Sequence, residues 1–467
     1  MKKSIEKSYY ILFVIILAFI LRLVNLNQSF WLDEAAQVIE SARPIFLQFK
    51  LAADFHPPLY HIFLHFGMIF SHTENWIRLP SVILGTGCIL LIAYLIPKKE
   101  NINKSILTAF LLSISPYHIW YSQEARPYML FVFLTLLTSF LLLRKKWVFY
   151  FIGVVFLIYS LYFWPFVLIG QGMWIFLKER KLLHRWIYCI ICSLIFYIPW
   201  IPSFIEQLKI GTGGVFAGWT DVVSFAPLKA VTLMFAKFAF GKGSISDHLL
   251  YGLILIPGLI FFSLGIVRRI REKNFDFIFI FFVSSFISLF LVSFFIPILA
   301  PQRLLFLIPF FYLITADGLL CLPKKIKSIG IFLVVVIALS GLLQYYLDPS
   351  VQRENWRDAV AYVENDNSNS NKLALFVFPD PFAPFLWYQT GKVEARGIAP
   401  HFILTGQDLV RMVPFVQGKD RVYLFEYLTG LTDPTGKTRK YLLSLGFENT
   451  GIKNYPGVGF IYIYDRI

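Results

Sequence analysis

The chain turns polar at Asn25-Leu-Asn-Gln-Ser-Phe-Trp-Leu-Asp-Glu-Ala-Ala-Gln37, directly after a run of apolar residues at positions 9–24. A bilayer core is crossed by about 20 apolar residues, so that run predicts a first membrane span. The polar stretch places two adjacent carboxylates, Asp33 and Glu34, at the end of this span and beside Trp31. Tryptophan is enriched at membrane–water interfaces. We therefore expect a membrane-anchored chain whose first loop holds acidic side chains at the bilayer surface.

The composition of the whole chain agrees with a membrane protein. Hydrophobic residues make up 57% of the 467 residues and charged residues only 15%, whereas soluble proteins carry about 25% charged residues. We predict a polytopic α-helical protein with about eleven transmembrane helices. The predicted spans lie at about residues 9–24, 79–96, 105–117, 127–143, 147–163, 164–177, 186–204, 248–267, 275–298, 304–321 and 328–346.

The net charge of +15 comes largely from short basic clusters between the apolar runs. Such clusters mark cytoplasmic loops, and they argue against a nucleic-acid partner. The predicted orientation has a cytoplasmic N-terminus in a prokaryotic plasma membrane, with loops 25–78, 115–126, 202–247 and 300–303 on the extracytoplasmic side. The basic clusters are Lys98-Lys99, Arg144-Lys145-Lys146, Lys178 to Arg185, Arg268 to Arg271 and Lys324 to Lys327.

The composition changes near residue 346, which predicts two domains, at 1–346 and 347–467. In the first, loop 25–78 is expected to carry juxtamembrane helices at 34–43 and 58–70. The second is predicted to be a small extracytoplasmic α/β domain. Its expected strands are at 373–378, 421–425 and 458–464, and its expected helices at 355–364 and 438–445.

Asp33 has two interpretations from residue type alone. Aspartate commonly caps the helix that follows it. Alternatively, a carboxylate held at the interface by Trp31 and Leu32 is partly desolvated, which makes it a stronger base. Four arginines on the predicted outer side can either bind an anion or extend their head groups to the lipid surface. They are Arg22, Arg78, Arg126 and Arg303.

Five motifs in order resemble the bacterial branch of the GT-C membrane glycosyltransferases. They are Leu32-Asp-Glu34, His56-Pro-Pro-Leu-Tyr60, Arg78-Leu-Pro-Ser81, Tyr121-Ser-Gln-Glu-Ala-Arg-Pro-Tyr128 and Trp356-Arg-Asp-Ala-Val-Ala-Tyr362. The pattern is similar to that of family 39, which is related to protein O-mannosyltransferases and lipid A aminoarabinose transferases. The resemblance implies transfer of a hexosyl or pentosyl group, with inversion, from a polyprenyl-phosphate donor to an extracytoplasmic acceptor.

The same resemblance implies roles for individual residues. Asp33 and Glu34 are the expected catalytic residues, with Asp33 as the general base. Arg126 and Arg303 are the first candidates to bind the lipid phosphate. Relatives often have tyrosine directly after the arginine that corresponds to Arg303, whereas this chain has Leu304. The remaining expected substrate contacts are Arg22, Arg78, His56, Tyr60, Tyr121, Gln123 and Glu124.

Several alternatives stay open at this stage. Some relatives bind a divalent metal ion near the position of His56, so His56, with Glu34 or His118, is a candidate ligand; substrate contact is the other interpretation. The acceptor can be a lipid, a cell-envelope polymer or a protein. A transporter or flippase of lipid-linked sugars would require charged residues in the middle of the spans. A catalytically inactive relative acting as a membrane receptor is a third interpretation.

Overall fold

The computed structural model describes residues 2–51, 54–95, 102–212, 226–296, 298–366, 370–377, 382–399 and 403–467. The chain forms two compact units, and each is described by itself. Unit 1 contains Met1–Leu26, His56–Pro202 and Val223–Val351. Unit 2 contains Asn27–Phe55, Ser203–Val222 and Gln352–Ile467. Unit 2 thus includes most of the first acidic loop, which the sequence had placed with the membrane domain.

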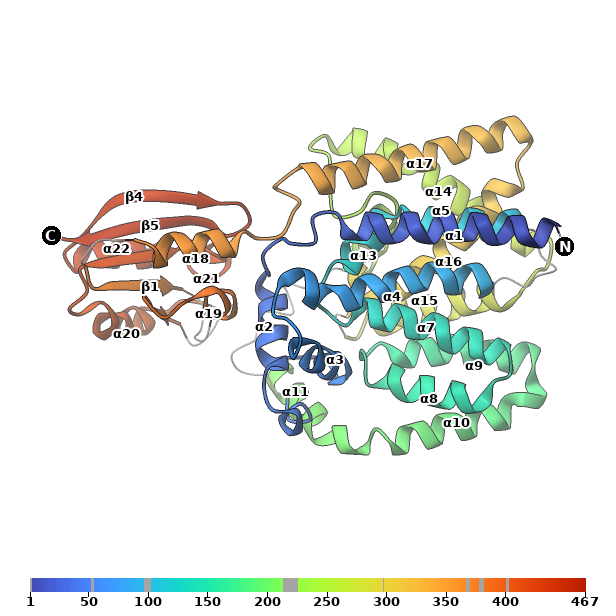
Figure 1. Cartoon of the computed structure of the whole chain (residues 1–467), viewed down its shortest axis with the longest axis horizontal. Helices are drawn as coiled ribbons and strands as arrows, with labels where there is room; N and C mark the ends of the chain where they lie inside the picture. The colour runs from blue at the N-terminus through green and yellow to red at the C-terminus, as the bar shows by residue number, and fades with distance from the viewer. Residues whose placement is uncertain are drawn as a thin grey trace. The chain divides into compact units, whose positions relative to one another are not determined.

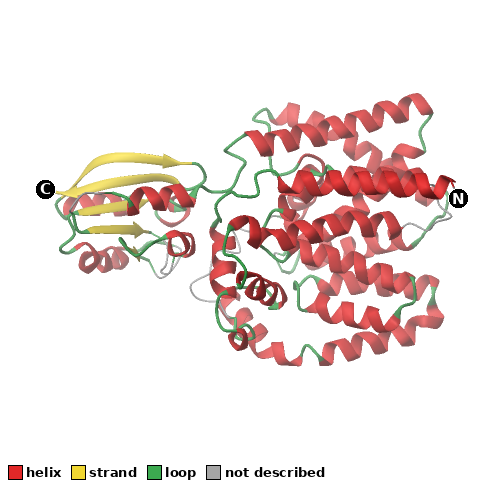
Figure 2. Ribbon diagram, in the orientation of Figure 1, coloured by secondary structure: helices red, strands yellow, loops and turns green. Residues whose placement is uncertain are grey.

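Unit 1 is helical, as Figures 1 and 2 show. A helix covers most of each predicted span, and the span predicted at 186–204 is divided between two helices and a 3-10 turn. In chain order the helices are α1 (Lys2–Leu23), α3 (Leu59–Met68), α4 (Glu74–Leu95), α5 (Ile102–Ser113), α6 (Pro116–Ser122), α7 (Tyr128–Leu143), α8 (Trp147–Ile158), α9 (Trp164–Lys178), η2 (Arg180–Leu182), α10 (Leu183–Ile195), η3 (Ile198–Trp200), α13 (Pro227–Phe240), α14 (His248–Arg271), α15 (Phe277–Val292), η5 (Pro301–Leu307), α16 (Ile308–Leu320) and α17 (Lys324–Leu347). Helix α11 (Ile201–Thr212) continues from unit 1 into unit 2.

Several of these helices are long and apolar enough to cross a membrane. Four in the described part of the chain meet that criterion: Glu74–Leu95, His248–Arg271, Pro301–Leu320 and Lys324–Leu347. A bent pair, Arg180–Ile195 with Ile198–Gly211, makes a fifth if it is one span. Further apolar helices, including Tyr128–Leu143 and Phe277–Val292, are shorter. The count of eleven spans therefore stays a prediction.

Helices α6 and α13 lie mainly in segments that the sequence analysis described as external loops. Helix α13 lies within 202–247 and buries Ala230, Met234 and Phe238. Helix α6 lies within 115–126, and its N-cap Ser115 accepts a bond from the N–H of His118 at 3.4 Å. Both helices are too short to register as spans, which is why hydropathy did not find them. Lys98-Lys99 and residues 213–225 of the long loop lie outside the described residues.

Unit 1 is held together by close helix packing and by one buried ionic cluster. A Cβ atom on Gly265 of α14 would collide with the carbonyl of Ile314 in α16, so only glycine allows this approach. Near the ends of the same helices, Asp317 pairs with Arg269 and, at 2.9 Å, with Lys104 of α5. Arg269 also pairs with Asp276, the N-cap of α15. The cluster therefore ties the ends of four helices together.

Unit 2 contains a five-stranded mixed sheet in the order β2-β1-β3-β5-β4. Strand β1 is parallel to β2 and β3, whereas β5 is antiparallel to β3 and β4. The strands predicted at 421–425 and 458–464 are confirmed. Strand β1 ends at Phe376, and position 378 of the strand predicted at 373–378 lies outside the described residues. The bounds are β1 (Lys372–Phe376), β2 (Glu394–Gly397), β3 (Arg421–Phe425), β4 (Phe447–Tyr455) and β5 (Gly459–Arg466).

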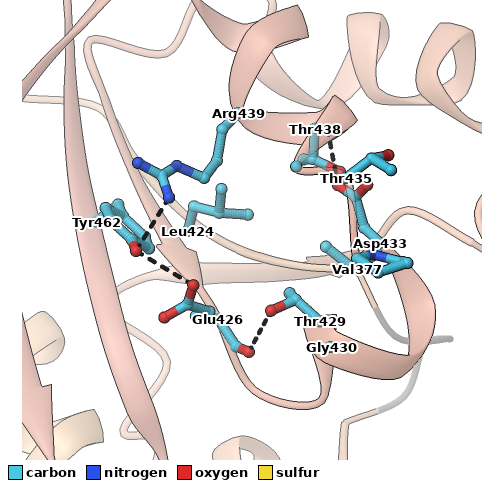
Figure 3. A pocket seen from close by; sticks show the side chains of 12 residues that line it. Val377, Leu424, Glu426, Thr429, Gly430, Asp433, Thr435, Thr438, Arg439 and Tyr462 are labelled. Carbon is cyan, nitrogen blue, oxygen red and sulfur yellow. Dashed lines mark hydrogen bonds between the residues drawn. The ribbon is translucent and has the colours of Figure 1, made fainter.

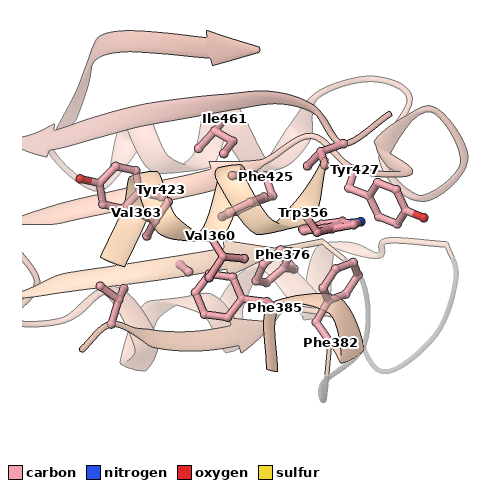
Figure 4. Packing of buried hydrophobic residues seen from close by; sticks show 14 of the residues in the cluster. Trp356, Val360, Val363, Phe376, Phe382, Phe385, Tyr423, Phe425, Tyr427 and Ile461 are labelled. Atoms are coloured by element: carbon pink, nitrogen blue, oxygen red, sulfur yellow. The ribbon is translucent and has the colours of Figure 1, made fainter. Parts of the chain in front are cut away.

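The sheet is covered on both faces, which explains why β1 and β3 are almost entirely buried. Trp356 of α18 (Trp356–Glu364) is central to one face and stacks on Phe425 at 5.8 Å between ring centroids (Figure 4). Helix α19 (Ala383–Tyr388) adds Phe385 to this face. Met412 of α20 (Gly406–Val416) and Leu442 of α22 (Lys437–Ser444) pack on the other face. The remaining helices of unit 2 are α2 (Leu32–Ser41), η1 (Ile45–Leu47) and α21 (Thr429–Thr432).

Candidate functional site

The acidic pair lies in the first turn of α2, inside unit 2. The helix begins at Leu32, and its N-cap is Trp31, which makes no side-chain capping bond. Asp33 therefore does not cap the helix, and that interpretation of the sequence is wrong. Asp33 is half-buried and Glu34 is fully buried. Both carboxylates lie at the positive end of the helix dipole, which stabilises negative charge there.

The start of α2 is held by Glu354, a residue that the sequence analysis did not select. Its carboxylate accepts bonds from the Leu32 main-chain N–H at 3.4 Å, from the Trp356 indole at 2.7 Å and from the Tyr427 hydroxyl at 2.9 Å. The Glu354 carbonyl also accepts a bond from the Ser29 hydroxyl. Glu354 thus connects the acidic loop to the core of the C-terminal sheet domain.

Further main-chain bonds fix the loop that leads to Asp33. The N–H of Phe30 donates to the Tyr388 hydroxyl at 2.7 Å, and the N–H of Trp356 donates to Ser29 Oγ at 3.1 Å. The ring of Phe30 also lies edge-on to Trp387, 5.7 Å away. Phe30 contributes its main-chain N–H and Ser29 its buried hydroxyl, so substitution of exposed side chains in the loop leaves these bonds in place. The position of Asp33 therefore depends on the C-terminal domain.

The environment of Glu354 also changes its acidity. Burial raises the pKa of its carboxyl from 4.5 to about 7, hydrogen bonds from Trp356 and Tyr427 oppose the shift, and the charge of Asp33 adds to it. Burial likewise raises the pKa of Tyr427 well above its ordinary value. A carboxyl with a pKa near 7 changes its charge over the physiological pH range.

In unit 1 the structure brings several predicted substrate contacts together around Arg126. Nη2 of Arg126 donates to Nδ1 of His56 at 3.0 Å, and the His56 ring lies edge-on to Tyr128 at 6.2 Å. Tyr128 also lies edge-on to Tyr121, at 5.0 Å. Arg303 interacts electrostatically with Tyr128, and its guanidinium lies 6.0 Å from the centre of the Phe163 ring. Two arginines, a histidine and an aromatic wall thus form one cluster.

Arg22 is placed differently, because its guanidinium is fully buried and used inside the helical unit. It donates to the carbonyls of Ala18 at 2.7 Å and Ser113 at 3.2 Å. It also donates to Ser122 Oγ at 3.1 Å and to His118 Nδ1 at 2.7 Å. These bonds join α1, α5 and α6, so the geometry favours a structural role over phosphate binding.

Gln123 completes the same arrangement at the end of α1. Its amide donates to the carbonyls of Arg22 at 2.9 Å and Val24 at 2.6 Å, and its oxygen accepts from the Tyr345 hydroxyl at 2.6 Å. The last carbonyls of a helix lack intrahelical partners, so Gln123 satisfies groups that would otherwise be unpaired. The bonds described here go to main chain and Tyr345, which favours a structural role for Gln123.

The other predicted residues of unit 1 are also buried. Arg78 donates to the Leu26 carbonyl at 2.8 Å, and the Tyr60 hydroxyl is 2.8 Å from Ser81 Oγ. Glu124 accepts a bond from the indole of Trp120 at 3.1 Å. These bonds of Arg78 and Tyr60 go to the protein's own main chain and to Ser81, which favours a structural role for both.

The residues that the structure describes do not fit a bound metal ion. No group of three or more His, Cys, Asp or Glu side chains able to hold one occurs among the described residues. Nδ1 of His56 accepts from a guanidinium, so its lone pair is already used, and the neighbouring positive charge disfavours a cation. His118, considered as a co-ligand, accepts from Arg22 in the same way. No step of a mechanism is therefore assigned to a metal.

No protein-family model and no curated protein matches this chain. Comparison with solved structures does find similar folds. ArnT from Cupriavidus metallidurans in the apo state is 9% identical, with a TM-score of 0.62 over 99% of this chain and 98% of that one. The same protein bound to undecaprenyl phosphate gives a TM-score of 0.61 at 10% identity, over 98% and 97% of the two chains.

A second solved protein has a similar fold. The Archaeoglobus fulgidus oligosaccharyltransferase, in complex with Zn and sulfate, is 11% identical, with a TM-score of 0.56 over 96% of this chain and 72% of that one. At these identities the comparison concerns the fold alone. The chain has a GT-C-like fold: a mostly helical membrane protein that carries a mixed five-stranded sheet.

Proposed function

We propose that this protein is a membrane glycosyltransferase of the GT-C type, related to family 39. It transfers a sugar from a polyprenyl-phosphate donor to an acceptor at the extracytoplasmic face of the membrane, with inversion at the anomeric carbon. The fold similarity to ArnT, which extends over nearly all of both chains and includes a complex with undecaprenyl phosphate, is the main observation behind the proposal. Its role would be in cell-envelope glycosylation.

In the proposed reaction, Asp33 is the general base. It accepts the proton of the acceptor hydroxyl while that oxygen forms a bond to the anomeric carbon of the donor. The bond between the anomeric carbon and the phosphate oxygen breaks, and the polyprenyl phosphate leaves with the electron pair. A positioned base contributes about 10²–10⁴-fold to such a reaction. Glu34, fully buried next to Asp33, is assigned to holding this turn of α2.

The leaving phosphate is assigned to Arg126 and Arg303. Arginine stays protonated and presents paired donors that match phosphate oxygens, so it stabilises the charge that develops as the bond breaks. The bond from Arg126 to His56 keeps the guanidinium oriented, and the Tyr121–Tyr128 pair offers aromatic edges to the donor. Arg22, Arg78 and Gln123 are not needed for this role, because their bonds fix the surrounding helices.

The test is sugar transfer by the purified protein in lipid nanodiscs, with radiolabelled polyprenyl-phosphate sugars and a cell-envelope extract as acceptor. We expect transfer by the wild-type protein and a loss of at least about 10²-fold for Asp33→Asn. Equal transfer by both proteins would remove the base assignment. In sealed proteoliposomes, movement of the intact labelled lipid across the bilayer, without cleavage, would instead identify a flippase.

The orientation is tested separately by cysteine labelling. A single cysteine at position 33 should react with a membrane-impermeant maleimide added to intact cells, because the proposed reaction takes place outside. Labelling only after the cells are permeabilised would contradict the proposal.

A further inference from the structure

A cavity lies within unit 2, at one edge of its sheet. Strands β2 and β3 lie on opposite sides of β1, so the chain reverses its winding direction at β1. The helix after β1, α19, packs on one face, and the helix after β2, α20, packs on the other. In sheets of this kind, ligands bind outside the carboxyl ends of the two strands where the direction changes. Here those strands are β1 and β3.

The structure has a cavity of about 340 Å³ at this place (Figure 3). Val377, which follows β1, and Glu426, which follows β3, both line it. Small-molecule sites typically have volumes of about 300–1,000 Å³, so the cavity suits a mono- or disaccharide-sized ligand. Gly430 and Gly436 also line it, and apart from their own chain neighbours and helix backbone, no heavy atom of the described residues lies within 4 Å of where their Cβ atoms would be.

The polar groups of the cavity alternate between donors and acceptors. The Tyr462 hydroxyl donates to Glu426 Oε1 at 3.2 Å and accepts from Arg439 Nη1 at 3.1 Å, as the dashed lines in Figure 3 show. The Arg439 guanidinium lies 4.0 Å from the centre of the Tyr462 ring. A carboxylate, a hydroxyl and a guanidinium thus form one fixed row on the cavity wall.

Thr438 supplies a second, independent observation that points to a ligand in this cavity. It lines the cavity and is fully buried, yet its hydroxyl has no hydrogen-bond partner among the described residues. Buried hydroxyls are nearly always hydrogen-bonded, so an unpaired one in a cavity wall indicates a missing partner. A hydroxyl can both donate and accept, which matches the hydroxyl groups of a sugar.

The charges argue against an anion in this cavity. Asp433 accepts bonds from the N–H groups of Lys437 and Thr438, each at 2.8 Å, so the start of α22 already has its negative partner. Together with Glu426, the cavity wall carries two carboxylates against the one guanidinium of Arg439. A phosphate or a uronic acid would meet net negative charge here.

We propose that this cavity binds a neutral saccharide and forms an acceptor subsite on the C-terminal domain. Glu426 and Arg439 contact sugar hydroxyls from one side, and Thr438 contacts the ligand from the other. That the sugar belongs to the acceptor rests on the proposed function; that the cavity binds a neutral sugar does not.

The test measures binding to the full-length protein in nanodiscs by saturation-transfer NMR. The probes are neutral mono- and disaccharides of glucose, mannose, galactose and N-acetylglucosamine, compared with glucuronate and inorganic phosphate. We expect saturable binding of at least one neutral probe. Thr438→Val should weaken it about 3–10-fold, and Glu426→Gln about 10-fold or more, because the latter bond involves a charged acceptor. The control Glu448→Gln, an exposed carboxylate on β4, should bind as wild type does.

The outcomes separate this inference from the proposed function. Tighter binding of phosphate than of any neutral probe, or equal binding by wild type and both cavity variants, would overturn the inference even if sugar transfer is observed. If the protein binds a saccharide in a way that depends on Glu426 but shows no sugar transfer, the saccharide site is supported and the proposed transferase function is contradicted. If both hold, Glu426→Gln should raise KM for the acceptor about 10-fold and leave kcat nearly unchanged.

Discussion

The carboxylate of Glu354 accepts a hydrogen bond from the main-chain N–H of Leu32, 322 positions earlier in the chain, at 3.4 Å. Leu32 is the first residue of α2, and Asp33 is the second. A free N–H at the start of a helix is usually satisfied by a local cap, which α2 lacks. Glu354, a residue of the C-terminal domain, therefore takes the place of the N-cap of α2. It fixes the turn that carries the proposed base.

Removing this contact should slow sugar transfer and also lower the stability of the fold. In Glu354→Ala, the Trp356 and Tyr427 donors lose their acceptor, which costs about 1–3 kcal/mol. Displacement of a reacting group by about 1 Å can reduce a rate about 10²-fold, so we expect kcat to fall about 10–100-fold. The measurement is kcat of transfer, together with thermal melting followed by tryptophan fluorescence.

Glu364 provides a matched control for that variant. It is a buried carboxylate of the same domain, and it accepts bonds from the main-chain N–H groups of Thr390, Lys392 and Val393. Glu364→Ala should lower the melting temperature by a similar amount and leave kcat of the folded protein nearly unchanged. A similar loss of kcat in both variants would mean that Glu354 acts only through general stability.

The raised pKa of Glu354 predicts a specific dependence of stability on pH. Below the ordinary value of 4.5 the carboxyl is protonated in both the folded and the unfolded chain, so the raised pKa carries no penalty. As the pH rises towards about 7, the unfolded chain ionises while the folded one keeps its proton, and folding loses free energy. For a partly buried group with this shift, the loss is about 1–3 kcal/mol above pH 7.

The measurement compares melting of wild type and Glu354→Gln from about pH 5 to pH 8. The variant is expected to be less stable at every pH, since the glutamine side chain has an NH2 donor in place of one of the two carboxylate oxygens that accept hydrogen bonds. The informative quantity is the slope: wild-type stability should fall relative to that of the variant as the pH rises. Parallel curves would show that Glu354 does not titrate in this range.

Local patterns in the sequence were sufficient to predict many of the helices and strands. The apolar runs predicted segments that are now seen as helices, because hydrophobicity over about 20 residues is a local property. The helix predicted at 34–43 is α2, and the helix at 355–364 is α18, within a residue or two at each end. Strands β1 and β3 were found because nearly all of their residues are buried and apolar.

What local patterns missed depends on contacts between distant residues. Strand β2, with the sequence Glu394 to Gly397, is a short polar edge strand whose conformation comes from pairing with β1. Glu354 and Gln123 act on groups more than 90 residues away, and nothing near them in the sequence indicates it. For the same reason the sequence did not predict that Asn27–Phe55 folds with the C-terminal domain.

Arg126 should be distinguished from the structural arginines by kinetics. In Arg126→Gln the phosphate loses a paired, charged donor, and kcat of transfer is expected to fall about 10²–10³-fold. Arg144→Gln, at the other end of α7 and exposed, is the matched control and should keep wild-type kcat. If Arg126→Gln transferred sugar at the wild-type rate while still folded, the phosphate would have to be bound elsewhere.

The ionic cluster around Asp317 should be a structural element of the helical unit. Asp317 pairs with Arg269 and Lys104, both almost completely buried. In Asp317→Asn these cations lose a charged partner, and breaking a buried pair in this way typically costs about 3–5 kcal/mol. We expect a clear drop of the melting temperature in detergent, with kcat of the remaining folded protein unchanged.

The exposed pair of Arg268 and Glu272, at 2.8 Å on the same helix, is the control. Glu272→Gln should change stability by less than about 1 kcal/mol, because solvent screens an exposed pair. Wild-type melting of Asp317→Asn would contradict a structural role for the cluster. Buried charges in a membrane helix that are not needed for stability usually belong to an ion or substrate path. That result, unlike loss of stability, would strengthen the transporter interpretation at the expense of the transferase.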